Sequence, residues 1–310
     1  MNTIKKHLVL YLKGVLMGVA DVVPGVSGGT IALLTGIYER LLNAIKSIDA
    51  EALRWLFNGK IAKLWKHVDG TFLLFLLGGI ATSLVLFAGI IHGLLETHPV
   101  QIWAFFFGLV IISSYLVAKR VRRWSAGKAF ALLIGAVIAY AVTSLTPATT
   151  PDSPFFLFIS GAIAICAMIL PGISGSFLLL ILGKYKFVMH ALKTFDVTTI
   201  LIFALGCLVG LLTFSRFISW TLKRFHDMTV AVLAGFMVGS LNKIWPWKQV
   251  LETRLNSKGV EVPLVEQNIL PETYANLHDG SAHTLEALAL ALGAIIVVYV
   301  FESFASKKTV

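Results

Sequence analysis

The sequence predicts an all-α polytopic membrane protein built as an inverted-topology repeat, and three observations support this class. The 310 residues are 57% hydrophobic and only 14% charged, whereas soluble domains carry about 25% charged residues. Apolar stretches of the length that crosses a bilayer recur along the chain. A helix-breaking motif occurs twice, as PGVSGGT at 24–30 and as PGISGS at 171–176. Repeated breaks in corresponding places of two halves are typical of transporters.

The apolar stretches predict six full crossings and two broken ones. The full crossings lie at 70–92, 100–118, 129–146, 197–222, 229–246 and 284–303. The broken stretches, 8–46 and 155–193, contain the repeated motif, and each is long enough for two half-helices. Such a pair could enter and leave on one side, as a re-entrant hairpin, or cross the membrane fully.

The distribution of Lys and Arg favours re-entrant hairpins with both termini in the cytoplasm. With that topology the cytoplasmic segments are rich in basic residues, the outside loops at 93–99 and 147–154 have none, and the external loop at 248–282 is mostly acidic. This asymmetry follows the positive-inside rule. Lys184 and Lys186 are exceptions, which a basic external entrance for an anionic headgroup would explain.

Each half then consists of one re-entrant broken-helix hairpin and three transmembrane helices, over 8–146 and 155–303. Because three crossings are an odd number, the second half is inserted upside down relative to the first. Weak sequence matches, such as FLLFLLG at 72–78 with ILIFALG at 200–206, support the pairing. The halves form one membrane domain, 1–310, because neither alone could satisfy its broken backbone.

Two further segments, 50–67 and the N-terminal 20 residues, lie outside the predicted full crossings. Residues 50–67 place apolar and basic side chains at helical spacing, which predicts either an amphipathic helix on the cytoplasmic leaflet or a connector packed on the protein. The N-terminal 20 residues resemble a signal peptide. However, Lys13 interrupts their apolar run and the first motif follows where a cleavage site would be expected, so we expect the segment to be retained.

The repeated motif has the chemistry of an anion site. Pro breaks the helix, and Gly lets a ligand or a backbone come close. Ser27 is a good N-cap for a helix that starts near Gly28, whose first N–H groups lack partners at the positive end of the dipole. Small residues that merely allow close helix crossing would explain one copy, but two matched copies favour headgroup binding. The predicted binding residues are Pro24, Gly25, Ser27, Gly28, Gly29, Thr30, Pro171, Gly172, Ser174, Gly175, Ser176 and Arg216.

Charged residues inside apolar stretches are the other candidates, because they are expensive there. Arg216 is a predicted phosphate ligand, since its planar guanidinium can bind phosphate bidentately. Asp21 and Glu39 are predicted coupling-ion sites for a proton or another cation. Structural ion pairs, or side chains that reach the interface, are the alternative. The eight His and two Cys residues show no metal-ligand spacing, so we predict no metal and no cofactor. The basic residues lie in short loops between apolar stretches, a pattern of membrane topology that predicts no nucleic-acid partner.

Several stretches of the sequence resemble those of a known family. The stretch GVLMGVADVVPGVSGGTIALLTGIYERLL at 14–42 is similar to the signature of the bacterial polyprenyl-phosphate transporter family, and the stretches at 165–185, 214–229 and 235–247 are similar to its later blocks. The resemblance implies that the chain returns the carrier lipid undecaprenyl phosphate across the cytoplasmic (inner) membrane for cell-wall synthesis. It also implies a transporter surrounded by membrane lipids, not an enzyme.

Two other functions stay open from the residues. One is an ion-coupled transporter of a small anion. The other is an intramembrane lipid phosphatase, which would need an acid or base and a strong cation beside the serine; neither motif has an adjacent Arg or a cluster of Glu. A homo-oligomer is compatible with the sequence, which does not define the oligomeric state.

Overall fold

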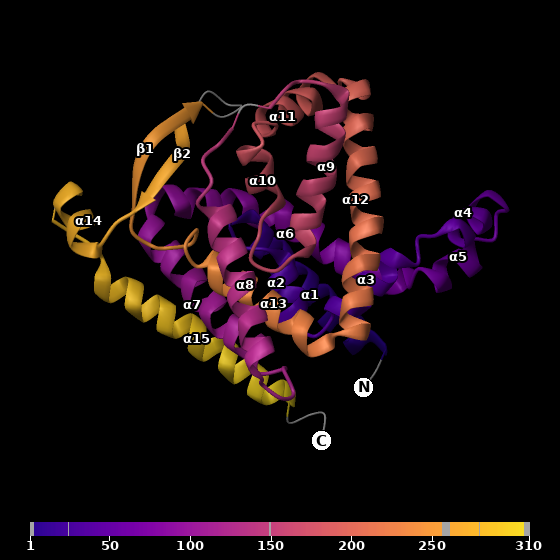
Figure 1. Ribbon diagram of the computed structural model, residues 1–310, viewed down its shortest axis with the longest axis horizontal. Coiled ribbons are helices and arrows are strands. Elements are labelled where there is room, and N and C mark those ends of the chain that lie inside the picture. Colours follow the sequence, from indigo (N-terminus) through magenta and orange to yellow (C-terminus); the bar gives the residue numbers. More distant parts are fainter. Residues whose placement is uncertain (1–2, 24, 149, 256–260, 279, 307–310) are drawn as a thin grey trace.

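The structure, a computed structural model, describes residues 3–23, 25–148, 150–255, 261–278 and 280–306. Most of these residues are helical (Figure 1). Within the described ranges, four helices are long and apolar enough to cross a membrane: α6 (Gly70–Thr97), α7 (Pro99–Ala118), α8 (Ala126–Thr143) and α12 (Val197–Arg224). Counting the bent pair α10 (Gly175–Ile181) and α11 (Tyr185–Thr194) as one span gives a fifth. The chain is therefore a multi-pass membrane protein, as its composition predicts.

The two remaining predicted crossings are also helical, but their apolar helical parts are shorter than those of the four spans. The 229–246 stretch forms α13 (His226–Ser240), and the 284–303 stretch forms α15 (Thr284–Ser306), whose apolar part covers Thr284–Val300. The chain turns directly after α13, and Pro246 could not donate a helical hydrogen bond beyond that turn.

The two broken segments have the same local structure. Their other helices are α1 (Thr3–Val22), α2 (Gly28–Leu34), α3 (Tyr38–Lys46) and α9 (Pro154–Ile169). The ends of α1 and α9 are 147 residues apart (169 − 22), as are the starts of α2 and α10 (175 − 28). Gly25 and Gly172 have φ of +87° and +85°, and Gly36 and Gly183 have +71° and +68°. These left-handed conformations favour glycine, so the repeat extends to the backbone conformation of each break.

Four helix pairs form the bundle. α1 packs along α6 in the first half, and α9 packs along α12 in the second. The other two pairs join the halves, because α8 packs on α13 and α7 packs on α15. A glycine lies at the close backbone approach of each pair: Gly79 against Tyr11, Gly206 against Phe158, Gly235 against Leu132 and Gly108 against Ala291. Small residues at helix crossings are typical of membrane bundles, where close packing supplies much of the association energy.

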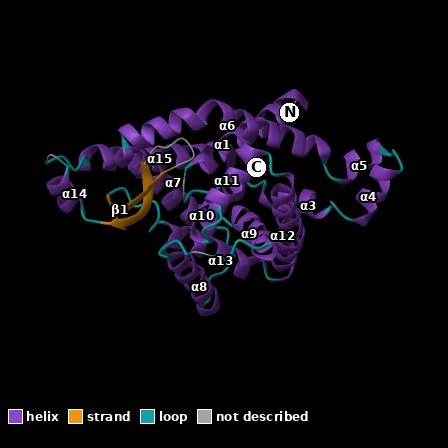
Figure 2. Cartoon of the chain, turned by 90° about the horizontal axis from the view of Figure 1, so that it is seen from above, coloured by secondary structure: helices purple, strands orange, loops and turns teal. Residues whose placement is uncertain are grey.

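The segment predicted as one amphipathic helix over 50–67 forms two helices. α4 (Ala50–Phe57) and α5 (Ile61–His67) pack on each other and are separated by Gly59, with φ of +67°. Asp49 caps α4 by accepting from the Ala52 amide (2.9 Å), and its carboxylate lies 3.3 Å from His67 Nε2. The pair projects from one end of the molecule (Figure 2). Several of its apolar side chains are exposed, namely Leu53, Leu56, Phe57, Ile61 and Trp65.

The segment predicted as an external loop over 248–282 contains a β-hairpin, which the all-α prediction does not include. β1 (Lys248–Leu255) pairs antiparallel with β2 (Glu261–Asn268), and α14 (Pro271–Leu277) follows. Two tryptophans join the ends of this segment by hydrogen bonds. Trp245 Nε1 donates to the Ile269 carbonyl (2.9 Å), and Trp247 Nε1 donates to the Ala282 carbonyl (2.8 Å).

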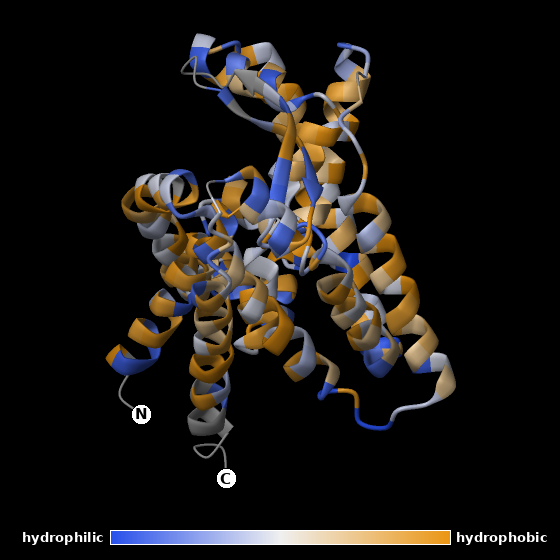
Figure 3. Cartoon of the chain, turned by 90° about the vertical axis from the view of Figure 1, so that its left-hand side faces the viewer, coloured by the Kyte–Doolittle hydropathy of each residue, from blue (hydrophilic) through white to orange (hydrophobic). Residues whose placement is uncertain are grey.

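The two ends of the molecule differ in content. The start of α1 and the end of α15 lie at one end, and α11 and the β-hairpin lie towards the other (Figures 1 and 3). Between them, the long helices are largely apolar (Figure 3), and many of their large apolar side chains are exposed. This placement agrees with two termini on the same side of a membrane.

Candidate functional site

The two repeated motifs meet in the centre of the molecule. The Ser27 hydroxyl donates to the Met168 carbonyl (3.3 Å), and the Gly172 amide donates to the Thr30 hydroxyl (3.1 Å). A Cβ added to Gly29 would lie only 2.7 Å from the Ile169 carbonyl oxygen. The helix that starts at the first motif therefore packs directly against the break of the second half.

At the first motif, the helix start already holds an anion. Ser27 caps α2 as predicted, because its hydroxyl accepts from the Gly29 amide (3.1 Å). The Asp21 carboxylate accepts from the Gly28 amide (2.6 Å) and so lies at the positive end of α2. The predicted coupling residue is thus part of the break itself. Pro24, another predicted binding residue, lies outside the described residues.

At the second motif, the helix start is arranged differently. The position equivalent to Asp21 is Met168 (21 + 147), so the carboxylate is not repeated. Ser174 occupies the N-cap position of α10, but its side chain makes no cap hydrogen bond and instead pairs with the Ser176 hydroxyl (2.9 Å). Ser174 is buried and Ser176 is exposed. Two hydroxyl groups thus lie together at the first turn of α10.

Cations hold the other end of α2. The Arg120 guanidinium donates to the carbonyls of Leu33 (2.7 Å) and Leu34 (2.8 Å), and Lys13 Nζ donates to the Thr35 carbonyl (2.7 Å). These groups satisfy the last carbonyls of α2 and complement the negative end of its dipole. Arg120, one of the basic residues between the predicted crossings at 100–118 and 129–146, therefore fixes the end of α2.

Arg216 and Glu39 contact other residues than those of the two motifs. The Arg216 guanidinium donates to the carbonyls of Leu212 (3.0 Å) and Ile48 (3.4 Å), where α12 packs on α3. Glu39 is exposed on α3, with its carboxylate 3.8 Å from His226 Nε2. Their predicted roles in phosphate binding and ion coupling stay predictions.

The expectation that Lys184 lines an external entrance is wrong. Its side chain is only 1% exposed. Its Nζ donates to the Thr150 carbonyl (2.9 Å) and pairs with Asp152, while the Thr150 hydroxyl donates to the Leu182 carbonyl (2.6 Å). The lysine breaks the positive-inside pattern because it anchors the preceding loop to the end of α10. Lys186 is exposed.

This pair should respond asymmetrically to substitution. Asp152→Asn leaves the Lys184 ammonium buried without its counter-ion, whereas Lys184→Met leaves only a carboxylate that is 68% exposed. Because an unpaired buried charge is the costlier remnant, we expect Asp152→Asn to lower the melting temperature by roughly 2–6 °C and Lys184→Met to lower it less. Thermal unfolding in detergent measures both, and the reverse order would contradict a structural role for the buried ammonium.

Lys243, which is not among the predicted binding residues, lies beside both motifs. A Cβ added to Gly25 of the first motif would lie 2.8 Å from Lys243 Cγ. Lys243 Nζ lies 4.9 Å from the ring centre of Phe177, which belongs to the first turn of α10, and donates to Glu266 (2.9 Å). The available signal was a lysine inside the predicted 229–246 crossing, since ionisable residues there mark functional sites.

Comparisons with known proteins agree on one family. A family model described as undecaprenyl phosphate translocase-like matches residues 17–262. A polyprenyl-phosphate transporter of Vibrio cholerae is 47% identical over 302 residues, which cover 97% of this chain and 98% of the relative. A polyprenyl-phosphate transporter of Staphylococcus aureus is 33% identical over 255 residues, which cover 76% of this chain and 85% of the relative. No solved structure matches.

Proposed function

Since this chain belongs to the undecaprenyl phosphate translocase-like family, we propose that it moves undecaprenyl phosphate between the leaflets of the bacterial cytoplasmic membrane. The lipid returns to the inner leaflet, where it is reused as a carrier. The observation that carries the proposal is the contact between the two matched breaks, where hydroxyl groups of the first half meet backbone groups of the second.

The phosphate headgroup binds at these breaks in this proposal. The second motif is the better candidate, because the first already holds the Asp21 carboxylate while the Ser174 and Ser176 hydroxyls have each other as partners. Hydroxyl groups at a helix start are suited to a phosphate. Arg216 is the proposed cationic ligand of the headgroup. Asp21 and Glu39 are the proposed coupling-ion residues.

The two halves alternate access by moving as inverted repeats in this proposal. The matched breaks support it, as do the helix pairs that exchange between halves, because α8 on α13 corresponds to α15 on α7 when the halves are swapped. The breaks are re-entrant in this arrangement, and both termini face the cytoplasm. Such a pair of repeats can expose a central site to each side in turn.

A reconstituted assay tests the headgroup site. Proteoliposomes with undecaprenyl phosphate report on its transfer between leaflets through a phosphate-binding probe present outside. We expect the Ser174→Ala/Ser176→Ala double variant to slow transfer by roughly tenfold, since a hydrogen bond to a charged group contributes about 1.5–3 kcal/mol. Ser215→Ala is the matched control, because that buried hydroxyl donates within its own helix, to Leu212.

The outcomes separate function from site. If the wild type transfers the lipid and the double variant does so equally fast, the headgroup binds elsewhere. If the wild type transfers no lipid, the function itself is wrong. Uptake of soluble anions or release of phosphate by the same proteoliposomes would then favour a small-anion transporter or a phosphatase.

A further inference from the structure

A polar cavity lies beneath the β-hairpin. It has a volume of about 290 Å³ and is lined by the end of α8, by α10, by the chain after α13 and by β2. We call it the hairpin cavity and define it by Tyr140, Ser144, Lys243, Lys248 and Glu266. Phe177 also lines it, so the cavity adjoins the first turn of α10, where the second motif begins.

The hairpin cavity has more ammonium groups than carboxylates among its described lining residues. Glu266 accepts from Lys243 Nζ (2.9 Å) and lies 3.7 Å from Lys248 Nζ, so two lysines share one carboxylate. The Lys248 side chain is 6% exposed, and within the described residues its Nζ has no hydrogen-bond partner. This ammonium rests 3.5 Å from the ring centre of Trp103. Burial lowers the pKa of Lys248 to about 7 against the opposing effect of Glu266, as expected for a cation that lacks enough anionic partners.

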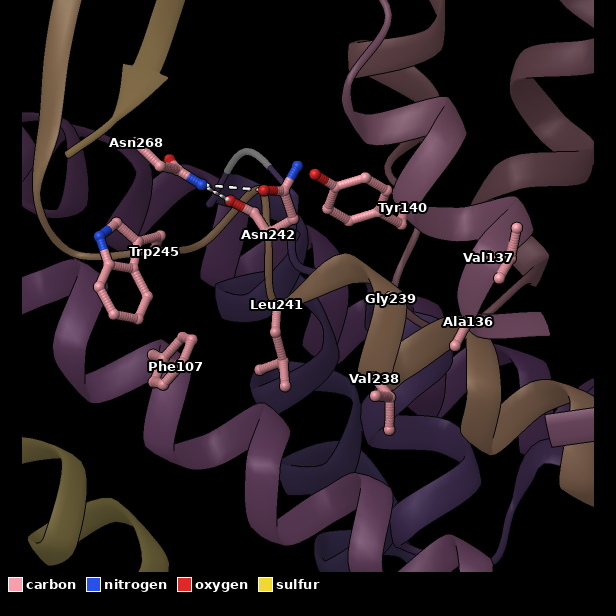
Figure 4. A pocket seen from close by; sticks show the side chains of 10 residues that line it. All are labelled: Phe107, Ala136, Val137, Tyr140, Val238, Gly239, Leu241, Asn242, Trp245 and Asn268. Atoms are coloured by element: carbon pink, nitrogen blue, oxygen red, sulfur yellow. Dashed lines mark hydrogen bonds between the residues drawn. The ribbon is translucent and has the colours of Figure 1, made fainter. Parts of the chain in front are cut away.

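An apolar groove continues from the hairpin cavity (Figure 4). It has a volume of about 510 Å³, and we define it by Phe107, Val137, Val238, Leu241 and Trp245. The cavity and the groove share three lining residues, namely Tyr140, Asn242 and Asn268.

Two asparagines mark the seam between cavity and groove. The Asn268 amide donates to the backbone carbonyl (2.7 Å) and the side-chain oxygen (2.9 Å) of Asn242, and the Tyr140 side chain lies beside them (Figure 4). Val137 and Tyr140 are each 57% exposed, so the groove is open on the outward side of α8. A polar, cationic compartment therefore borders an open apolar one.

We propose that the hairpin cavity and the apolar groove form a loading site for a polyprenyl phosphate, with the phosphate on Lys243 and Lys248 and the first isoprene units in the groove. Glu266 occupies the phosphate position while the site is empty and leaves it when the lipid enters. This inference rests on the proposed function. An anion on an apolar chain is the occupant that matches both compartments at once, and charge-assisted contacts with two ammonium groups are strong in such a buried setting.

The location of Lys243 gives the loading site a route to the breaks. Its side chain contacts Gly25 of the first motif and Phe177 after the second. A phosphate that moves from the hairpin cavity towards the breaks therefore keeps one ammonium beside it. Glu266 and Lys248 lie on the two paired strands of the hairpin, whereas Lys243 precedes the hairpin. A shift of the hairpin would therefore carry the carboxylate away from Lys243, and a rotation of the Glu266 side chain would free Lys248.

Binding of geranylgeranyl phosphate to the purified full-length protein in detergent tests the loading site. We expect Lys243→Met and Lys248→Met each to weaken binding by about tenfold, the loss expected for one charge-assisted contact. We expect Glu266→Gln to strengthen binding by roughly threefold to tenfold, because it removes the competing carboxylate while keeping its shape. Glu261→Gln, on the same strand, and Lys186→Met, an exposed lysine, are the matched controls and should bind like the wild type.

The Glu266→Gln variant keeps the test decisive, because a misfolded protein would not bind more tightly. Unchanged or weaker binding by this variant would overturn the role of Glu266 and with it the loading site. Inorganic phosphate that binds as tightly as the prenyl phosphate would instead indicate a soluble-anion site and overturn the lipid proposal. Geranylgeraniol lacks the phosphate, so Glu266→Gln should leave its binding affinity unchanged.

Transfer of undecaprenyl phosphate in proteoliposomes separates this inference from the proposed function. Suppose the wild type transfers the lipid, but Lys243→Met, Lys248→Met and Glu266→Gln all leave the binding of geranylgeranyl phosphate unchanged. The loading site is then wrong and the proposed function stands. If the wild type neither binds the prenyl phosphate nor transfers the lipid, the function fails and the loading site fails with it.

Discussion

Replacing Gly172 by alanine is expected to destabilise the protein strongly and to abolish transport. The residue has φ of +85°, and an added Cβ would lie 2.8 Å from Ser240 Oγ and 2.9 Å from the Phe236 carbonyl oxygen. A left-handed conformation costs an L residue about 1–2 kcal/mol, and overpacking a filled site adds about 1–3 kcal/mol, so the total is roughly 2–5 kcal/mol. The substitution would also push the second motif away from α13 and strain the hydrogen bond from the Gly172 amide to Thr30.

Two other glycines separate these contributions. Gly36 has φ of +71° but nothing within 4 Å of an added Cβ, so Gly36→Ala should show the conformational strain alone. Gly78 lies inside α6, also with open space around an added Cβ, and Gly78→Ala should be neutral or stabilise by about 0.5–1 kcal/mol. Thermal unfolding in detergent and lipid transfer in proteoliposomes measure all three. Equal effects of Gly172→Ala and Gly36→Ala would show that the close approach to α13 contributes nothing.

The sequence predicts the breaks well because single residues determine them. Proline and glycine disrupt a helix wherever the chain runs, and the offset of 147 residues appears both in the letters and in the helix bounds. The same stretch, 14–42, carries the family resemblance, and the matching family model with the two relatives confirms it. Ser27 as an N-cap is confirmed for the same reason, since capping is a local interaction.

The sequence does not predict what depends on distant partners. Lys243 and Glu266 are 23 residues apart, and only the hairpin brings them together. Lys184 violates the charge rule for a reason, its bond to the loop at Thr150, that no periodicity reveals. The two strands mix charged and apolar residues, so they give no apolar run to recognise. The break between α4 and α5 is different, because the Asn58-Gly59 dipeptide is a turn signal that could have been used.

Asp21→Asn is expected to leave the fold intact and to slow ion-driven transport at least tenfold. The carboxylate accepts from the Gly28 amide at 2.6 Å, and an added Cβ on Gly28 would lie 2.6 Å from Asp21 Oδ2, so the group is pressed against the start of α2. An asparagine keeps an acceptor oxygen for that amide and preserves the cap, but it cannot exchange a proton or neutralise a cation. Ionisable groups at such depth are costly and are kept mainly for function.

The comparison of three variants shows whether Asp21 couples transport or only caps α2. Asp21→Ala removes both the charge and the acceptor, so it should lower the melting temperature as the loss of a cap, about 1 kcal/mol, does. If Asp21→Asn transports at the wild-type rate with the same dependence on the ion gradient, Asp21 is a cap alone. A larger effect of Glu39→Gln would then place the coupling group on α3. Because the carboxylate accepts from the Gly28 amide, a proton or cation that draws it away would remove this bond at the start of α2, where the two halves meet. In the proposed transport cycle, ion binding would in this way weaken the contact between the halves.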